Sequence, residues 1–438
     1  MERYDSYKDS GVEWIGEIPS HWVNSKFKYL TKKEVQYGVN SSSDNYCDEG
    51  IRFIRTTDID DFGKLKIGGV FIEEDGIDKS QITEEFDFLI SRSGTLGRTY
   101  LHQSNERMTY GGYLVRFNFG HPSLSKFIQF YCHSTSFWDW ISLNTIVSTI
   151  GNVNGQKYNN MEVPLPPLSE QQQIVSFLDT KTSLIDSLIE KTQRKIELLK
   201  EKRTALINEV VTKGLNPNVE MKDSGVEWIG EIPSSWSKTK ISRFCEVKDG
   251  THDTPKYIDI SEESIPLVTS NSFVNGEIDF SKSKRISTQD YIEINKRSDV
   301  KFNDVIMSMI GSNIGNRVLV QTEKPFSIKN VCLFKTSNSQ KLNSKYLIYL
   351  IDSKYLKYQV DFNQKGGGQP FLSLDELRSL LFPFPPISEQ QQIVSYLDEQ
   401  TQLIDKTISI EEKRIELLKE YRQSLISEVV TGKINIQN

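Results

Sequence analysis

Apolar residues recur at alternating steps of four and three positions over two long stretches, at about 169–214 and 388–433. Most other positions there are Lys, Glu, Arg, Asp or Gln. A repeat of 3.5 residues that continues for about five heptads is typical of paired coiled-coil helices. Polar residues interrupt both stretches at matching places, as Thr182 with Thr401 and Arg203 with Arg422. The aliphatic seam consists of Leu178, Ile185, Ile189, Ile196, Leu199, Leu206 and Val210, and of Leu397, Ile404, Ile408, Ile415, Leu418, Leu425 and Val429.

Both helices have recognisable ends. A Pro-Pro pair precedes Ser169 and Ser388, and a glutamate follows each serine, as expected near the positive end of a helix. Gly214 and Gly432 mark the ends. Each helix then has about 42 residues and a length of roughly 63 Å. An exposed seam needs a partner, and an equivalent helix lies in the same chain. We therefore expect intramolecular pairing, antiparallel rather than parallel, with a coiled coil between two separate chains as the alternative.

The regions beside the helices have short β-branched and aromatic runs separated by Gly, Asn and Asp, a pattern that predicts strands of a mixed sheet. The runs of one region align with those of the other, and residues 125–142 and 344–358 read as helices. The aligned runs are 51–57 with 265–271, 87–90 with 304–307, and 113–116 with 332–335. The expected fold class is α+β, with two mixed α/β domains joined by two long helices in an internal repeat.

The repeat is also visible as identical residues in the two copies. The phrase KDSGVEWIGEIPS occurs at 8–20 and again at 222–234, and the long helical stretches are nearly identical. Repeats of this size indicate two copies of a domain-plus-helix unit rather than a solenoid. We divide the chain into a first domain at 1–163 (repeated motif at 8–22), a first helix at 164–214, a second domain at 215–382 (repeated motif at 222–236) and a second helix at 383–438.

Composition narrows the class of protein. The 53 Lys and Arg against 59 Asp and Glu give a net charge of −6, which is not typical of a nucleic-acid binder acting alone. Any DNA affinity would then be shared with a partner. The four cysteines lie apart, without a CxxC pair or a histidine cluster, so we expect neither a metal site nor disulfides. The chain lacks a long apolar stretch and its first residues are polar, so we expect a cytoplasmic protein without a membrane segment.

Candidate recognition residues lie where the two copies differ. The loop at 91–98 becomes a different loop at 308–317, with glycines kept and polar residues exchanged, as expected when loops on a rigid scaffold carry recognition. Ordinary drift in surface turns, and a flexible exit for the Gly-rich loop before each helix, are the alternatives. The candidates in the first copy are Arg55, Thr56, Thr57, Arg92, Ser93, Arg98, Gln156 and Lys157. Those in the second are Thr269, Ser270, Asn271, Ser312, Asn313, Asn316, Arg317, Lys365 and Gln369.

Other conspicuous residues and motifs give no indication of a catalytic site. Trp14, Trp22, Trp228 and Trp236 keep the same places in both copies, which favours packing anchors over readers of differing targets. The chain has neither an Asn/Asp-Pro-Pro-aromatic methyltransferase motif nor a phosphate-binding GxxxxGK[ST] loop. The five histidines have no matched spacing. We expect no catalytic residue and no cofactor in this chain.

The phrases GVEWIGEIPSHW, PLPPLSEQQQIVSFLD and IEKTQRKIELLKEKRTALINEVVTKG, and their repetition, resemble the specificity subunits of type I restriction-modification systems over essentially the whole chain. The resemblance implies that each domain reads one half of an asymmetric, bipartite double-stranded DNA target, while antiparallel helices set the unread gap. It also implies docking of two methyltransferase subunits, which use S-adenosylmethionine to methylate adenine, and of motor-nuclease subunits for restriction.

Two other functions stay open at this point. The chain could be a scaffold whose two modules bind proteins instead of DNA, or a catalytic subunit with an unrecognised site. Salt separates the first from DNA binding, because counterion release makes DNA affinity fall steeply with ionic strength. The absence of S-adenosylmethionine binding by the purified chain would argue against the second.

Overall fold

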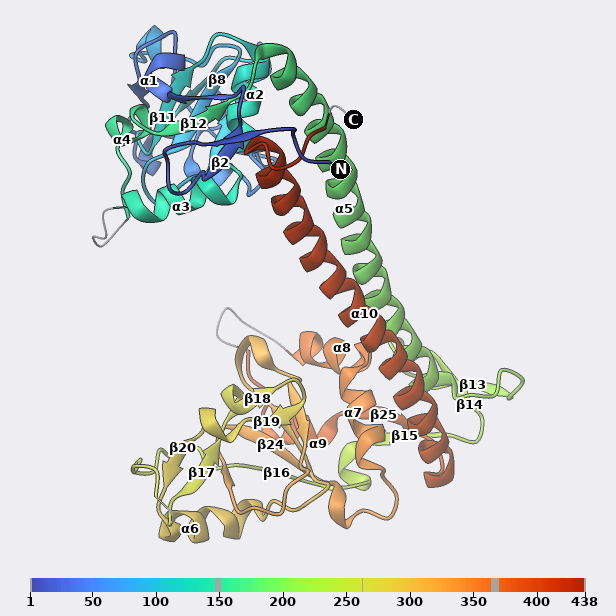
Figure 1. Ribbon diagram of the computed structural model, residues 1–438. Coiled ribbons are helices and arrows are strands. Elements are labelled where there is room, and N and C mark those ends of the chain that lie inside the picture. Colours follow the sequence, from blue (N-terminus) through green and yellow to red (C-terminus); the bar gives the residue numbers. More distant parts are fainter. Residues whose placement is uncertain (1, 146–150, 262, 364–369, 437–438) are drawn as a thin grey trace. The chain divides into compact units, whose positions relative to one another are not determined.

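The computed structural model describes residues 2–145, 151–261, 263–363 and 370–436. The chain divides into two compact units, one of Met1–Gln193 with Glu412–Asn438 and one of Arg194–Glu411. Each unit contains one variable domain and part of both long helices, α5 (Leu168–Lys213) and α10 (Ile387–Val430) (Figure 1). The expected class, two mixed α/β domains with two long helices and an internal repeat, is confirmed.

Two four-stranded sheets form the first domain. One has the order β10-β6-β7-β5, with β10 and β6 parallel; the other, β4-β11-β8-β9, is antiparallel. Two-stranded pairs β1-β2 and β12-β3 complete it. The strands are β1 (Tyr7–Asp9), β2 (Glu17–Pro19), β3 (Val23–Lys26), β4 (Gln36–Tyr37), β5 (Tyr46–Cys47), β6 (Ile51–Ile54), β7 (Val70–Ile72), β8 (Asp87–Ser91), β9 (Thr99–Leu101), β10 (Met108–Tyr110), β11 (Leu114–Asn118) and β12 (Glu162–Leu165). The helices are α1 (Phe27–Leu30), α2 (Pro122–Tyr131), α3 (Thr135–Asn144) and α4 (Gly155–Asn159).

The second domain repeats this plan. Its antiparallel sheet β16-β24-β21-β22 corresponds to β4-β11-β8-β9, and its mixed sheet β20-β17-β23 again contains one parallel pair. The strands are β13 (Met221–Asp223), β14 (Glu231–Pro233), β15 (Ser237–Lys240), β16 (Glu246–Asp249), β17 (Ile265–Val268), β18 (Phe273–Val274), β19 (Glu277–Ile278), β20 (Lys284–Ile286), β21 (Val305–Ser308), β22 (Arg317–Leu319), β23 (Ser327–Ile328), β24 (Val331–Lys335) and β25 (Leu381–Phe384). The helices are α6 (Thr288–Ser298), α7 (Ser344–Asp352), α8 (Lys354–Asn363) and α9 (Leu374–Ser379).

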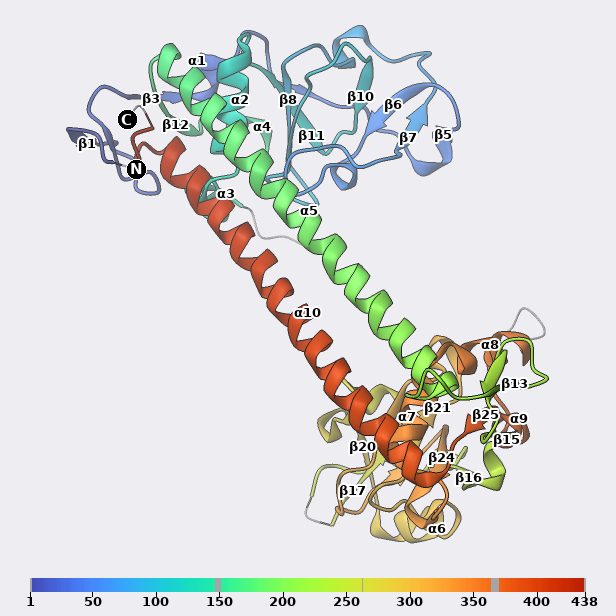
Figure 2. The same ribbon diagram turned by 90° about the vertical axis from the view of Figure 1, so that its right-hand side faces the viewer.

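The long helices lie side by side and run antiparallel within each unit (Figures 1 and 2). In the first unit Arg422 Nε donates to Asp186 Oδ1 at 2.8 Å. In the second, Arg203 Nε donates to Asp405 Oδ1 at 2.9 Å. In each case an early part of one helix meets a late part of the other. The antiparallel intramolecular coiled coil expected from the sequence is therefore confirmed.

The predicted seam positions face the partner helix or the adjoining domain. Leu178, Ile196, Leu397 and Val429 are at most 1% exposed, while Ile189, Leu199, Leu206, Ile415 and Leu418 are half-buried. The N-terminal part of α5 and the C-terminal part of α10 join the core of the first domain, which also contains Phe127 and Tyr131. The C-terminal part of α5 and the N-terminal part of α10 join the equivalent core of the second domain. The helices are thus continuous with the domain cores.

A tryptophan and a glutamate connect each domain to the start of its helix. Trp22 is fully buried and its Nε1 donates to Glu170 Oε1 at 3.1 Å. Trp236, 1% exposed, donates in the same way to Glu389 Oε2 at 2.9 Å. In the first copy Tyr4 also donates its hydroxyl to Glu170 Oε1 at 2.6 Å. These carboxylates lie in the first helical turn, where the helix dipole favours negative charge.

Three local details differ from the sequence expectations. Each expected domain helix (125–142 and 344–358) is broken into two, because Ser134 and Ser353 turn their hydroxyls back to the carbonyls of Tyr131 and Leu350. The Ser134 hydroxyl also accepts from Phe137 N and so starts α3. The long helices begin one residue before Ser169 and Ser388, and α6 is a helix that we did not predict.

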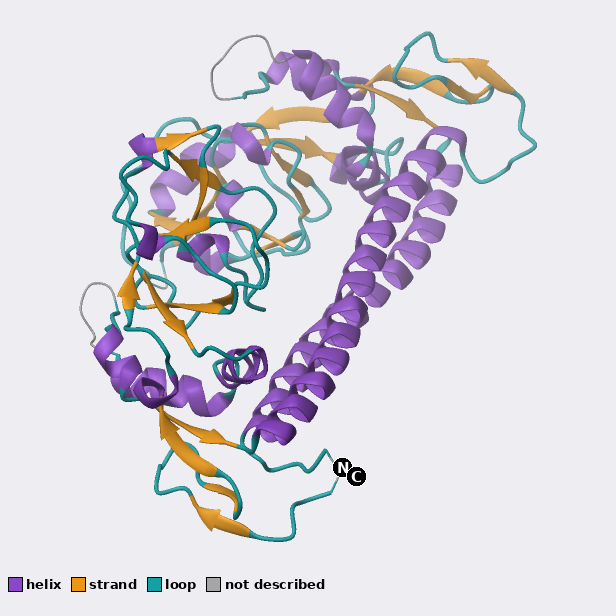
Figure 3. Ribbon diagram, turned by 90° about the horizontal axis from the view of Figure 1, so that it is seen from above, coloured by secondary structure: helices purple, strands orange, loops and turns teal. Residues whose placement is uncertain are grey.

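The first and last described segments, near Glu2 and Asn435, lie side by side in the first unit (Figure 3). Asn435 N donates to Glu2 O at 2.8 Å, and the Tyr7 hydroxyl donates to Gly432 O at 3.1 Å. Gly214 and Gly432 have φ values of +73° and +71°, the left-handed conformation that ends helices and that glycine adopts without strain. No helix in the described part of the chain combines the length and apolar character needed to cross a bilayer.

Candidate DNA-recognition faces

Three segments of the first domain meet at one edge of its sheets. The segment at 55–57 follows β6, the turn at 111–113 joins β10 to β11, and the loop at 92–98 follows β8. Pairing of β6 with β10 and of β8 with β11 places them side by side. Gly111 N donates to Ile54 O at 2.9 Å, and Arg92 N donates to Tyr113 O at 2.9 Å. The sheets therefore determine the order of the segments on this face.

A cavity of about 590 Å³ opens on this face. It is lined by the candidates Arg55, Thr56 and Thr57 together with Tyr46 and Tyr113, among others. Tyr113 is 60% exposed, and the Arg55 guanidinium lies 5.5 Å from the centre of the Tyr46 ring. Aromatic, hydroxyl and guanidinium groups on a concave surface suit contacts to nucleotide bases and phosphates.

Asp58 holds Arg55 in a fixed orientation. Arg55 Nε and Nη2 donate to the two carboxylate oxygens of Asp58 at 3.0 and 2.7 Å. Burial alone would raise the pKa of the Asp58 carboxyl, but the hydrogen bonds from Arg55 lower it below its usual value. The pKa of Arg55 rises in turn. A restrained guanidinium loses less side-chain freedom when it binds a ligand.

The other first-loop candidates are more engaged by the protein. Arg92 stacks over the Tyr37 ring at 4.9 Å, and Ser93 is 6% exposed. Arg98 donates to Asp61 Oδ1 at 2.5 Å and to the Ile59 carbonyl. The structure thus brings Arg92 to the face, while Arg98 lies at the side of the loop that faces 59–61.

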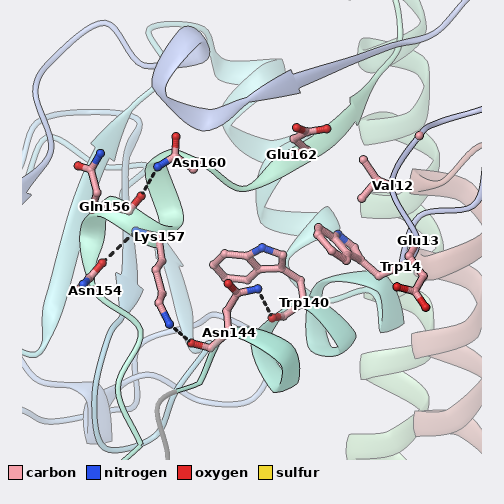
Figure 4. Close-up of a pocket in the computed structure, with 11 residues that line it drawn as sticks. Val12, Glu13, Trp14, Trp140, Asn144, Asn154, Gln156, Lys157, Asn160 and Glu162 are labelled. Carbon is pink, nitrogen blue, oxygen red and sulfur yellow. Dashed lines mark hydrogen bonds between the residues drawn. The ribbon is translucent and has the colours of Figure 1, made fainter.

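Gln156 and Lys157 lie on α4 beside a second cavity, of about 500 Å³ (Figure 4). Trp14 of the repeated motif and Trp140 of α3 also line this cavity. Lys157 Nζ donates to the Asn144 carbonyl at 2.5 Å, which directs its charge toward α3. Lys157 therefore lies apart from the cavity that Arg55, Thr56 and Thr57 line.

The second domain builds a matching face with other residues. Thr269, Ser270 and Asn271 follow β17, just as 55–57 follow β6, and Asn271 is exposed. Ser312, Asn313 and Asn316 are exposed in the loop after β21, while Arg317 pairs with Asp352. Burial raises the pKa of the Asp352 carboxyl even though Arg317 lowers it. The remaining candidates, Lys365 and Gln369, lie outside the described residues.

A crossing loop in the first domain was missed by the sequence reasoning. Gly38 passes so close to the Tyr110 carbonyl that an added Cβ would lie 2.1 Å from the oxygen. Val39 N then donates to Tyr110 O at 2.7 Å, and Gly112 N donates back to Val39 O at 2.9 Å. The next residue, Asn40, is exposed and lines the same cavity as Arg55.

The second domain has the same crossing. A Cβ on Gly250 would lie 2.3 Å from the Ile328 carbonyl oxygen. Thr251 N donates to Ile328 O at 3.0 Å, and Asn330 N donates back to Thr251 O at 3.1 Å. His252 follows and is exposed. The only sequence signal for this loop is a glycine between unlike residues in both copies.

The described residues hold no group of three or more His, Cys, Asp or Glu side chains that could bind a metal ion. The two faces consist instead of hydroxyl, amide, guanidinium and phenol groups on matched scaffolds. The fold and these faces define a protein with two recognition modules of the same architecture and different surface chemistry.

Comparison with known proteins assigns the family. A family model described as the type I restriction modification DNA specificity domain matches residues 19–198 and 233–420, one match for each copy. Because the matches cover most of the chain, it belongs to this family of DNA specificity proteins.

Several relatives are specificity subunits of type I restriction enzymes. The MjaVIII subunit of Methanocaldococcus jannaschii is 26% identical over 293 residues, 66% of this chain and 66% of the relative. The EcoBI subunit of Escherichia coli is 22% identical over 68% of this chain and 63% of the relative. The chain thus spans just under two thirds of their lengths. The StySPI subunit of Salmonella potsdam is 20% identical over 96% of this chain and 91% of the relative.

Solved structures share the fold. One, from work on assembly and conformational transition of the type I R-M system, has a TM-score of 0.73 at 14% identity and covers 95% of this chain and 99% of its own. The HsdS subunit of Thermoanaerobacter tengcongensis has a TM-score of 0.54 at 14% identity, covering 95% and 98%.

Proposed function

We propose that this chain is the DNA-reading and assembly subunit of a type I restriction-modification complex. Each domain reads one half of an asymmetric, bipartite double-stranded target, and the antiparallel helices set the length of the unread gap. The observation that carries this proposal is the pair of matched scaffolds with different polar loops. Identical loops would imply a symmetric target. Here Arg55, Thr56 and Thr57 of the first domain are replaced by Thr269, Ser270 and Asn271 at the equivalent places of the second.

The helices also offer a surface for the methyltransferase subunits. Exposed apolar residues lie at heptad spacing on the outer side of each helix. They are Leu184 (62%) and Leu198 (49%) in α5, where Lys191 stands between them, and Leu403 (61%), Ile410 (58%) and Leu417 (53%) in α10. Leu184 and Leu403 are equivalent in the repeat, as are Leu198 and Leu417. Exposed apolar stripes of this kind mark interaction surfaces. Because the stripe occurs twice, we propose that two methyltransferase subunits dock there.

In this proposal the chain itself is not catalytic. The partner methyltransferases bind S-adenosylmethionine and modify adenine, and motor-nuclease subunits join for restriction. The candidates Arg55, Thr56, Thr57, Thr269, Ser270 and Asn271 carry guanidinium, hydroxyl and amide groups, which suit hydrogen bonding to DNA. The assignment therefore rests on recognition chemistry.

The decisive experiment is co-expression with a type I methyltransferase from the same genome, in a host without adenine methylation, followed by genome-wide mapping of methylated adenines. A gapped, asymmetric motif with one methylated adenine per half is the expected result. A stable complex that produces no motif would contradict DNA reading. It would favour the protein-scaffold function, as would an affinity for DNA that does not fall with salt.

Docking has its own test. Leu403→Glu places a charge in one copy of the stripe, and native mass spectrometry should then show a complex with one methyltransferase subunit instead of two. Gln402→Glu, which adds the same charge at an exposed position of α10 about 100° around the helix from Leu403, is the control and should retain two. Two bound subunits with Leu403→Glu would contradict docking on the stripe.

A further inference from the structure

Both domains place a carboxamide between the same two backbone segments, and they do so from different positions in the sequence. In the first domain the Asn40 side chain covers Gly112, since a Cβ built on that glycine would lie 2.2 Å from Asn40 Oδ1. Any side chain at position 112 would displace the amide. Asn40 is exposed and lines the same cavity as Arg55.

In the second domain the amide comes from the opposite segment. Asn330 occupies the place of Gly112, with a φ of +56°, a left-handed conformation that Asn tolerates better than most residues. His252 occupies the place of Asn40, and its Nδ1 lies 3.0 Å from Asn330 Oδ1. The residue pair is therefore Asn with Gly in one domain and His with Asn in the other.

A chain of contacts fixes the imidazole of His252. Its Nε2 lies 2.9 Å from Asp249 Oδ2, and Arg297 of α6 donates to Asp249 Oδ1 from Nε at 2.9 Å. The Asp249 side chain is 7% exposed. Burial would raise the pKa of its carboxyl, but the hydrogen bonds from His252 and Arg297 lower it below its usual value, so the carboxylate stays charged. The second domain thus holds the Asn330 amide through His252, Asp249 and Arg297, the last of which lies on helix α6.

The position of these amides is central on each face. Lys329 N donates to Val268 O at 2.9 Å, directly before the candidates at 269–271. On the other side Val331 pairs with Ser308, directly before the loop at 309–317. Asn330 therefore lies between the two candidate loops of the second domain. The first domain has the same arrangement. Tyr110 pairs with Ile54, directly before 55–57, and Leu114 pairs with Ser91, directly before 92–98. Asn40, which covers Gly112, therefore lies between these two loops.

We infer that Asn40 and Asn330 each read a base edge in their half-site, and that His252, held by Asp249, is the positioning residue for Asn330. A carboxamide offers one donor and one acceptor side by side, which match N7 and the N6 amino group of adenine in the major groove. Each half-site then contains an A·T pair that is read by this amide. The inference deepens the proposed function and rests on it.

The test is competitive binding by the complex of the full chain with its methyltransferase. The competitors are duplexes of the mapped target in which one base pair at a time is replaced. A bidentate amide contact discriminates by about tenfold to a hundredfold. Asn330→Ala should remove this preference at one A·T pair of the second half-site and leave every other position unchanged. Asn40→Ala should do the same at one pair of the first half-site.

His252 is tested at the same base pair. His252→Ala should reduce the preference at the pair affected by Asn330→Ala. His252→Gln, whose carboxamide can donate or accept at that place, should recover most of it. The double variant His252→Ala/Asn330→Ala should be no worse at that pair than Asn330→Ala alone, because the two residues act as one unit. A merely structural role for His252 would instead weaken all positions together. Lys296→Ala, at an exposed cation of α6, is the matched control and should leave all preferences unchanged.

The outcomes separate the two proposals. If the wild-type complex has no bipartite target, the proposed function fails. If it has one, and Asn40→Ala and Asn330→Ala change no preference, or lower affinity equally at every position of both halves, the inference about the amides is overturned while the proposed function stands. Loss of preference at two unrelated base pairs by His252→Ala and Asn330→Ala would overturn the positioning role alone.

Discussion

Replacing Asp304 by Asn should loosen the second domain alone. The carboxylate is fully buried at the start of β21 and pairs with Lys335 Nζ at 2.6 Å, whose side chain is 2% exposed. It also accepts from Lys301 N at 2.9 Å and from the Ser337 hydroxyl at 2.7 Å. An asparagine keeps the shape but turns an amide group or a neutral oxygen toward a buried ammonium. Lys335 then loses its charged partner, and its ammonium keeps neutral acceptors such as the Asp299 carbonyl.

The cost follows from this burial. Removing one partner of a buried ion pair typically costs about 3–5 kcal/mol, because the other charge stays buried without compensation. For a domain of this size that corresponds to a fall in Tm of roughly 6–20 °C. The exposed pair between Lys301 and Asp299, at 3.1 Å, serves as the control. Lys301→Gln should cost less than about 1 kcal/mol.

Urea denaturation combined with hydrogen exchange read by mass spectrometry would locate the effect. Asp304→Asn should lower protection in residues 237–382 and leave 23–163 as in the wild type, because each unit has its own core. In the assembled complex, discrimination should weaken in the second half-site only. A loss of stability no larger than that of Lys301→Gln, or a loss of protection shared equally by both domains, would refute the reasoning.

Three further predictions can be checked with simpler variants or reagents. Deleting one heptad from each helix, residues 189–195 and 408–414, shortens the pair by about 10 Å and should shorten the unread gap by about three base pairs without changing either half-site; an unchanged gap in the methylation map would contradict the role of the helices. Arg422→Ala should destabilise more than Arg203→Ala in urea, although the two are equivalent in sequence, because Arg422 is 8% exposed and also lies 4.5 Å from the Phe62 ring; equal losses would count against this. Burial raises the pKa of the Cys132 and Cys332 thiols and that of Cys245 to about 12, so at neutral pH only the half-buried Cys47 should react with a thiol reagent; four fast-reacting thiols would show that these cores are open.

Local signals in the sequence were enough to predict the two long helices and their ends. The heptad pattern predicted both helices, and the glycines at 214 and 432 predicted their ends, because periodicity and capping depend on neighbours along the chain. The breaks at Ser134 and Ser353 were missed, because serine is compatible with a helix until its hydroxyl turns back to a carbonyl. Helix α6 was missed because its mean hydropathy is low and it replaces a short turn in the other copy.

The recognition faces were harder to predict. Arg55 and Asn271 lie within the aligned runs 51–57 and 265–271, so their position could be inferred from the alignment of the copies. Asn40 and His252 could not, because each approaches its face through a loop that crosses a turn about 70 to 80 residues further along the chain. Only the close approach at Gly38 and Gly250 fixes that crossing, and a single glycine in a sequence does not show which backbone it passes.

In each domain, the strand that follows the repeated motif pairs with the strand that leads into the long helix. Val23 lies opposite Leu165 in the β3–β12 pair, and Ser237 lies opposite Phe384 in the β15–β25 pair. Chain entry and exit are therefore neighbours, next to the same tryptophan–glutamate connection in both copies. A foreign module with the same spacing between its ends could replace either one without changing the helices. In the proposed function, exchange of one whole domain between these paired strands would therefore change the DNA sequence that is read. It would do so without rebuilding a binding surface one residue at a time.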